Sequence, residues 1–337
     1  MNVLFELSKE HATLPVDEIL CCFKAEKISY TILQQNENVI VINTPASVSD
    51  IKQISKRLAY SFYVDELIFS CKNTLKHLQE SATNHPIDEI GSLAIYYKNK
   101  SKEKNSQQIL SVLAKNYTKN RVVDLKYADI KIRAIITDDT IFVGKVLFQI
   151  DRSAFEQRKV QYRPFFSPIS LHPKLARSLV NLCRVSKDET VFDPFCGTGG
   201  ILLEAGLLGI HVIGSDIEDK MIQGCKTTLD FYNIKNYELF QGDIGDILSK
   251  IHKPVDAVVT DFPYARSTTT KGEDITSLYR RSFSAISSVL KKDGYAVMGV
   301  FDKNLVCVDK QNLKILKIYE FKVHRSMIRY FFVFKKV

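Results

Sequence analysis

The chain has 337 residues, 45% of them hydrophobic and 25% charged, which is enough apolar material for two or three domain cores. Its formal net charge of +9 favours a polyanionic partner. The first residues show no signal-peptide pattern, and no apolar run approaches the ~18 residues of a membrane span. The seven cysteines are scattered and form no metal-binding pattern. We therefore expect a cytoplasmic protein with reduced thiols, no membrane segment and no metal site.

The N-terminal half predicts small α+β regions. The predicted elements are a buried strand over residues 39–42, a helix over 106–116 and strands over 130–136 and 141–150. A turn at residues 43–45 ends the first strand, and a turn at 137–140 joins the last two. We expect an N-terminal subdomain over residues 1–55 and a second domain over 56–152.

Most of the excess positive charge lies in one stretch of this half. Between Tyr96 and Arg133 there are ten Lys or Arg against three acids, an excess of seven. Lys131 and Arg133 alternate along one predicted strand and should share a face. A solvated surface would explain the short run at residues 98–104, whereas the whole stretch fits a nucleic-acid contact.

The C-terminal half predicts a regular α/β domain. Residues 153–170, with basic residues and two prolines, look like a linker, and the domain follows over residues 171–337. The predicted helices cover residues 173–183, 218–232 and 276–290, and the strands cover 190–192, 211–215, 238–241, 256–260, 295–300, 314–321 and 327–334. The last two strands have no helix between them and predict an antiparallel hairpin. We therefore expect a doubly wound, mostly parallel sheet of seven strands.

A Gly-rich turn is the sharpest local signal. The predicted strand ending at Asp193 runs into Pro194, Gly197, Thr198 and Gly199 and then directly into a helix. A phosphate-binding P-loop would need a Lys followed by Ser or Thr, which is missing. A dinucleotide fingerprint would need a glycine at position 202, where the chain has Leu202.

Three acids at three successive strand ends decide between these ligands. Asp193 can hold an ammonium group, Asp216 can accept both hydroxyls of a ribose, and Asp243 can accept from an adenine amine. Such a trio would repel a pyrophosphate but fits an amino-acid nucleoside, which indicates S-adenosylmethionine. The candidate cofactor-binding residues are Asp193, Pro194, Gly197, Thr198, Gly199, Asp216, Ile217, Asp243 and Ile244.

The fourth strand ends in the candidate catalytic residues Asp261, Phe262, Pro263 and Tyr264. An exocyclic amine on a base is a poor nucleophile because its lone pair is delocalised into the ring. The Asp261 carboxylate and the Phe262 carbonyl could hold its two N–H bonds and turn the lone pair toward a sulfonium methyl. Tyr264 would stack on the base. An ordinary strand-ending proline turn is the competing interpretation.

These motifs resemble a known family. Residues 193–206, 163–168 and 171–177 are similar to the archaeal and eukaryotic tRNA (guanine-10 N2) methyltransferases, and residues 151–158 resemble the junction that follows a THUMP RNA-binding domain. The resemblance implies an α+β, ferredoxin-like and THUMP N-terminal region, a Rossmann-like class I methyltransferase domain, and S-adenosylmethionine-dependent addition of one or two methyl groups to guanosine 10 of tRNA. Candidate RNA-binding residues are then Lys126, Lys131, Arg133, Arg152 and Arg163.

The resemblance also leaves alternatives. The family has Pro where this chain has Phe262 and Gly where it has Ala265, which would make the loop less rigid. The substrate could be another tRNA guanosine or ribosomal RNA, and an amine in DNA is a less favoured substrate. Alternatively, the chain could be a tRNA-binding relative without catalytic activity, which would explain Phe262. Eukaryotic members need a small zinc-binding activator protein, so such a partner is a hypothesis for this chain, which we otherwise expect to be a monomer.

Overall fold

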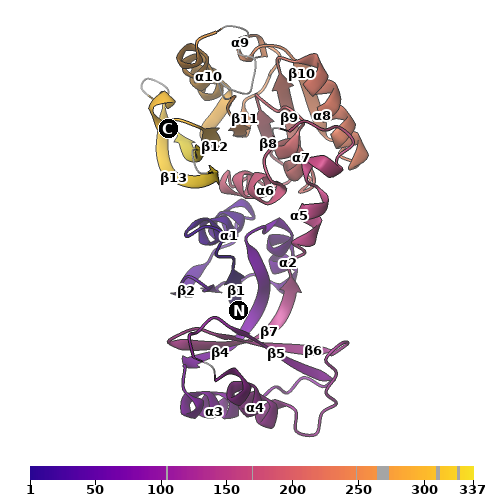
Figure 1. Ribbon diagram of the computed structural model, residues 1–337, viewed down its shortest axis with the longest axis vertical. Helices are drawn as coiled ribbons and strands as arrows, with labels where there is room; N and C mark the ends of the chain where they lie inside the picture. The colour runs from indigo at the N-terminus through magenta and orange to yellow at the C-terminus, as the bar shows by residue number, and fades with distance from the viewer. Residues whose placement is uncertain (104, 169, 248, 264–272, 309–311, 325–326) are drawn as a thin grey trace. The chain divides into compact units, whose positions relative to one another are not determined.

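The computed structural model describes residues 1–337 except 104, 169, 248, 264–272, 309–311 and 325–326 (Figure 1). Its internal contacts divide the chain into two compact units. The first comprises Met1–Val16 and Lys27–Asp151, and the second comprises Asp17–Glu26 and Arg152–Val337. Among the described residues, no helix combines the length and the apolar character needed to cross a membrane.

The first unit is built on a seven-stranded sheet. In spatial order its strands are β2 (Thr31–Gln35), β3 (Val39–Asn43), β1 (Asn2–Leu7), β4 (Ser61–Lys72), β7 (Thr140–Gln149), β6 (Ile130–Ile136) and β5 (Leu93–Asn99). Neighbouring strands are antiparallel except β5 and β6, which are parallel. Strands from both sides of residue 55 thus join one sheet, and the division expected there stays a prediction.

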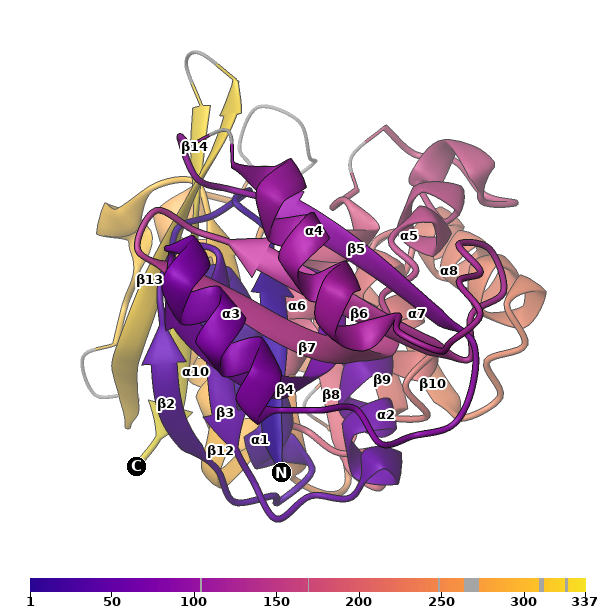
Figure 2. The ribbon, with the colours of Figure 1, turned by 90° about the horizontal axis from the view of Figure 1, so that it is seen from below.

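Helices complete the first unit's core. α2 (Val48–Arg57) begins at a capping box in which Ser47 and Asp50 satisfy each other's backbone N–H groups. α3 (Leu75–Asn84) and α4 (Ser106–Tyr117) lie side by side over β5, β6 and β7, where their apolar side chains form one buried cluster with the strands (Figure 2). The helix predicted over residues 106–116 is confirmed as α4.

The second unit contains the other seven-stranded sheet. In spatial order its strands are β10 (Tyr237–Gln241), β9 (His211–Asp216), β8 (Thr190–Asp193), β11 (Val255–Asp261), β12 (Leu290–Val300), β14 (Met327–Lys336) and β13 (Leu313–His324). The first five are parallel, and β14 pairs antiparallel with both β12 and β13. The seven strands and the terminal hairpin agree with the predicted pattern.

Helices lie on both faces of this second sheet. The helices of the unit are α5 (Ser153–Gln157), which packs against α6, and α6 (Pro173–Leu182), α7 (Gly200–Gly206), α8 (Asp219–Phe231), α9 (Ile244–Ile247) and α10 (Ile275–Val289). On one face Phe192 and Ile213 pack in a buried cluster with Phe283 of α10. On the other face Gly214 lies against Leu202 of α7, where an added Cβ would come within 2.4 Å of a Leu202 methyl carbon. The alternation of Ile213 and Gly214 explains these opposite neighbours.

Two further segments belong to the second unit. Residues 153–170, expected as a linker, contain α5, whose Phe155 is buried, and place the Phe165 ring against Gly224 of α8. Most of helix α1 (Leu14–Ala25) also packs here. Its Glu18 accepts a hydrogen bond from the Asn181 amide at 3.0 Å, and its Asp17 accepts one from the Tyr319 hydroxyl at 2.8 Å.

Candidate functional site

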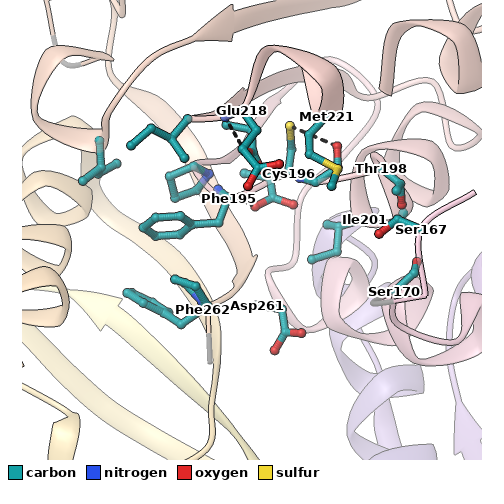
Figure 3. Close-up of a pocket in the computed structure, with 18 of the residues that line it drawn as sticks. Ser167, Ser170, Phe195, Cys196, Thr198, Ile201, Glu218, Met221, Asp261 and Phe262 are labelled. Carbon is teal, nitrogen blue, oxygen red and sulfur yellow. Dashed lines mark hydrogen bonds between the residues drawn. The ribbon is translucent and has the colours of Figure 1, made fainter. Parts of the chain in front are cut away.

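A cavity of about 440 Å³ lies at the carboxyl ends of β8, β9, β10 and β11. Open parallel sheets bind ligands at this edge, because the loops that follow neighbouring strands diverge there. Ser167, Ser170 and Thr198 lie at one end of the cavity, and Phe195 with Phe262 lies at the other (Figure 3). Ser167 and Ser170 precede the first predicted helix of the domain. Ser167 lies in the family-like run 163–168, but neither serine is among the residues predicted for the site.

The Gly-rich turn forms one wall of the cavity. Gly197 has φ +49° and Gly199 has φ +77°, a left-handed conformation that favours glycine. A Cβ at Gly199 would lie 2.5 Å from the Sγ atom of Cys225, so glycine is required there for space as well. Pro194, Gly197 and Thr198 line the cavity, whereas Gly199 packs against Cys225.

Asp193 ends β8 and is buried, with 1% of its surface exposed. Its Oδ1 accepts a hydrogen bond from the Thr260 hydroxyl at 2.6 Å and another from the Phe195 N–H at 3.2 Å. Burial raises the pKa of this carboxyl to about 7, despite these two donors. A cationic ligand group beside Asp193 would favour the ionised form, so this corner of the cavity suits an ammonium.

Asp216 ends the neighbouring strand, β9. Its Oδ2 accepts from the Gly197 N–H at 3.0 Å and its Oδ1 from the Glu218 N–H at 3.0 Å. Each oxygen has one such donor among the described residues, so the two oxygens can also accept two hydroxyl donors. This acceptor pair fits the vicinal diol of a ribose. Ile217, which follows Asp216, also lines the cavity.

Asp243 lies beyond the end of β10, and Ile244 beside it lines the same cavity. Its carboxylate is bound by the Arg281 guanidinium, which lowers the pKa of Asp243. Glu273 binds the same guanidinium from the other side, with 2.8 Å between Arg281 Nε and Glu273 Oε1. Sequence reasoning missed both Arg281 and Glu273, because they lie about 30 residues or more beyond Asp243 and form no local motif with it.

Asp261 ends β11 in the middle of this edge of the sheet. Arg329 of β14 lies 3.3 Å from Asp261, measured from Nη1 to Oδ2. Gly299 of β12 leaves room for the carboxylate, because a Cβ there would come within 2.4 Å of Asp261 Oδ1. Asp261, Phe262 and Pro263 line the cavity, and Tyr264 lies outside the described residues.

Phe262 has a fully buried side chain. Its ring centroid lies 5.2 Å from that of Phe195, 4.5 Å from that of Tyr279 and 5.5 Å from that of Phe283. The aromatic residue in this position therefore belongs to the core between β11 and α10. This packing explains why the chain has Phe rather than Pro after Asp261.

Two of the five candidate RNA-binding residues are buried. The Arg133 guanidinium binds Glu6 and, at 2.8 Å, Asp65 inside the first unit. Arg163 donates from Nε to the Arg158 carbonyl at 2.8 Å. These two arginines cannot meet RNA in this conformation, which corrects the expectation that they are exposed. Lys126 is exposed beside the Tyr127 ring, whereas Lys131 and Arg152 are half-buried.

Four carboxylates lie along the strand ends that border the cavity. The strand order β10, β9, β8, β11 puts Asp243, Asp216, Asp193 and Asp261 in one row along the sheet edge. This is the order of adenine, ribose and methionine in S-adenosylmethionine, followed by the acceptor of the methyl group. Within the described ranges, no group of His, Cys, Asp or Glu side chains is arranged to hold a metal ion.

Comparisons with known proteins agree with this arrangement. A family model described as an RMKL-like methyltransferase domain matches residues 160–330. A second model, described as a DNA methylase, matches residues 15–227 and so ends before Asp261. The structure superposes on the solved structure of TrmN from Thermus thermophilus with a TM-score of 0.59. The superposition covers 100% of both chains at 16% sequence identity, which shows a shared fold.

Two curated proteins match over their full lengths. The chain is 32% identical to a tRNA (guanine(10)-N2)-dimethyltransferase of Methanothermobacter thermautotrophicus, over 100% of both chains. It is 30% identical to the protein of the same name from Methanocaldococcus jannaschii, over 99% of both chains.

Proposed function

The chain belongs to the family of tRNA (guanine(10)-N2)-dimethyltransferases and carries their methyltransferase domain, and on this premise we propose that it methylates N2 of guanosine 10 in tRNA. The methyl donor is S-adenosylmethionine, whose sulfonium supplies an electrophilic methyl group when bound. The row of four acids at one sheet edge carries this proposal, because each matches a different part of the donor and acceptor.

The chain's own residues bind and orient. Asp193 holds the ammonium, Asp216 accepts the ribose hydroxyls and Asp243 accepts from adenine. Asp261 and the Phe262 carbonyl accept the two N–H bonds of the guanine N2 amine. This aligns its lone pair and stabilises the positive charge that develops on nitrogen. The family name of the full-length relatives supports transfer of two methyl groups.

In this proposal the first unit binds the tRNA, as a THUMP-like, ferredoxin-like RNA-binding region. The exposed Lys126 and the half-buried Lys131 are the basic side chains that support it. A protein that flips a base out of a folded RNA needs contacts with the surrounding backbone, which phosphate-binding cations provide. Arg152 remains a candidate contact in the second unit. A zinc-binding activator protein stays a hypothesis, as does a monomeric state.

Single-turnover transfer of labelled methyl groups to unmodified tRNA tests the proposal. Asp261→Ala should fold and bind both ligands, yet lose transfer roughly 10²–10³-fold, the scale of a lost preorganised electrostatic contact. Asp261→Asn should lose less, because an amide oxygen still accepts one N–H bond. Nucleoside mass spectrometry with site mapping should find N2-methylated guanosine at position 10. Wild-type transfer by Asp261→Ala would remove the role of this carboxylate.

The DNA methylase match makes DNA amines the second candidate substrate. The same assay, run on duplex DNA in parallel with tRNA, distinguishes the two candidate substrates. Because the full-length relatives are named for their action on tRNA, we expect the labelled methyl group to appear in tRNA and not in DNA. Label in DNA alone would replace the tRNA proposal. Binding of tRNA without any transfer would instead identify the non-catalytic alternative.

A further inference from the structure

Arg281 of α10 joins two carboxylates at the adenine end of the cavity. Its Nη1 donates to Asp243 Oδ1, and its Nη2 donates to Asp243 Oδ2 at 2.7 Å. Its Nε donates to Glu273 Oε1 at 2.8 Å, and Nη2 also donates to Glu273 Oε2 at 2.6 Å. Two parallel bonds to each partner fix the plane of the guanidinium, and through it the plane of the Asp243 carboxylate.

The hydrogen bonds of the Asp243 carboxylate determine how many further donors each of its two oxygens can accept. Oδ1 accepts from Arg281 and from the Gly245 N–H at 2.8 Å, which uses both of its lone pairs. Among the described residues, Arg281 is the one hydrogen-bond donor to Oδ2, which leaves that oxygen a lone pair. Asp243, Glu273 and Arg281 all line the cavity. One acceptor position, held in a fixed orientation, is therefore available to a ligand at this end.

We propose that Arg281 is a positioning residue that makes this cavity selective for a 6-aminopurine. It holds Asp243 so that the one remaining acceptor on Oδ2 meets an N–H bond of the exocyclic amine. This inference rests on the proposed function, because it assumes that the adenine of S-adenosylmethionine occupies this end of the cavity.

The fixed carboxylate rejects a 6-oxopurine for a simple reason. The purine oxygen has no hydrogen to donate, so it and Oδ2 would face each other as two acceptors, and the N1–H of a 6-oxopurine lies beside that position rather than at it. A carboxylate free to rotate could turn away from that oxygen and be solvated, whereas one held by Arg281 cannot. Glu273 keeps Arg281 in place, since it occupies the Nε edge that would otherwise bind water. Selectivity therefore depends on all three side chains.

Calorimetric titration with S-adenosylhomocysteine and its 6-oxo analogue, S-inosylhomocysteine, tests this role without measuring catalysis. The wild-type protein should bind the adenosyl ligand roughly 10–100-fold more tightly, the scale of an unpaired buried acceptor. Arg281→Met should lower this ratio about tenfold, mainly by weakening the adenosyl ligand. Arg280→Met, an exposed neighbour on the same helix, should keep the wild-type ratio.

Two more variants separate positioning from folding. Asp243→Asn should bring the ratio close to one, because the amide can turn its NH₂ group toward the 6-oxo oxygen. Glu273→Gln, which leaves the Arg281–Asp243 pair intact, should lower the ratio less than Arg281→Met does. A wild-type ratio in a folded Arg281→Met protein would overturn the inference. Failure of the wild-type protein to bind either ligand would overturn the proposed function, and this inference with it.

Discussion

The backbone N–H of Phe262 donates a hydrogen bond to the carbonyl oxygen of Gly299, with 2.9 Å between nitrogen and oxygen. Proline has no such N–H, although relatives of this chain are expected to carry proline in this position. From the sequence alone, Phe262 costs the loop some rigidity, and Phe262→Pro is expected to keep or raise methyl-transfer activity. The hydrogen bond and the buried ring add a different expectation, which is that proline here lowers the stability of the fold.

Phe262→Pro should therefore destabilise the second unit. It removes a buried aromatic side chain and a backbone hydrogen bond, together worth about 3–5 kcal/mol of unfolding free energy. Urea denaturation followed by circular dichroism measures the loss. Phe262→Leu is the control, since it keeps the N–H and much of the volume and should cost about 1–2 kcal/mol. Equal stability of the proline variant and wild type would show that the loop adapts.

Cofactor affinity should depend on pH through Asp193. Burial raises the pKa of this carboxyl to about 7 in the ligand-free protein, and a ligand ammonium binds the ionised form best. The affinity for S-adenosylhomocysteine should therefore rise from pH 5.5 and level off above about pH 7. Calorimetry across this range measures it. A flat profile, or one unchanged in Asp193→Asn, would place the ammonium elsewhere.

The same carboxyl should make the ligand-free protein less stable as pH rises. The pKa of Asp193 is raised from its ordinary value of 3.8 to about 7, so between these two values the folded state binds more protons than the unfolded state. The contribution of Asp193 to unfolding free energy therefore falls as pH rises from about 4 to 7 and is constant above. Asp193→Asn should remove this component from the slope. Thermal melts in matched buffers test the sign.

Asp216→Ala should weaken S-adenosylhomocysteine binding and leave tRNA binding nearly intact. It removes the two acceptors for the ribose hydroxyls, worth on the order of 1.5–3 kcal/mol for a charged hydrogen bond. Asp219→Ala, an exposed acid at the start of α8, is the matched control and should bind like wild type. Unchanged affinity in the Asp216 variant would show that the ribose lies away from β9.

Replacing Lys126 and Lys131 with Glu should weaken tRNA binding but not cofactor binding. Wild-type affinity should fall steeply with salt, as counterion release requires, and the double variant should show a shallower slope. Filter binding at several salt concentrations gives both values. Replacing Arg133 would be a poor test, because its loss leaves Glu6 and Asp65 buried without their cation. Wild-type slopes in the lysine variant would move the RNA contact elsewhere.

The sequence could predict those parts of the molecule that depend on neighbouring residues. The Gly-rich turn and the acids at strand ends each follow an apolar strand, so their place in the sheet follows from local pattern. Strand β4 was missed, because its Asp65 is polar yet buried, and only the distant Arg133 makes that burial favourable. The Asp243, Arg281 and Glu273 contacts likewise depend on how α10 packs beside α9, which no local pattern reports.

The course of α1 has a consequence for how the protein is made. A ribosome synthesises Asp17 of this helix about 300 residues before its partner Tyr319. At a synthesis rate of roughly 5–20 residues per second, this helix waits about 15–60 seconds for its binding site. The first unit is complete by Asp151 and can fold during that interval. Expression of Arg152–Val337 alone would lack the helix, so an isolated catalytic half needs residues 17–26 supplied as a separate peptide or fused to it.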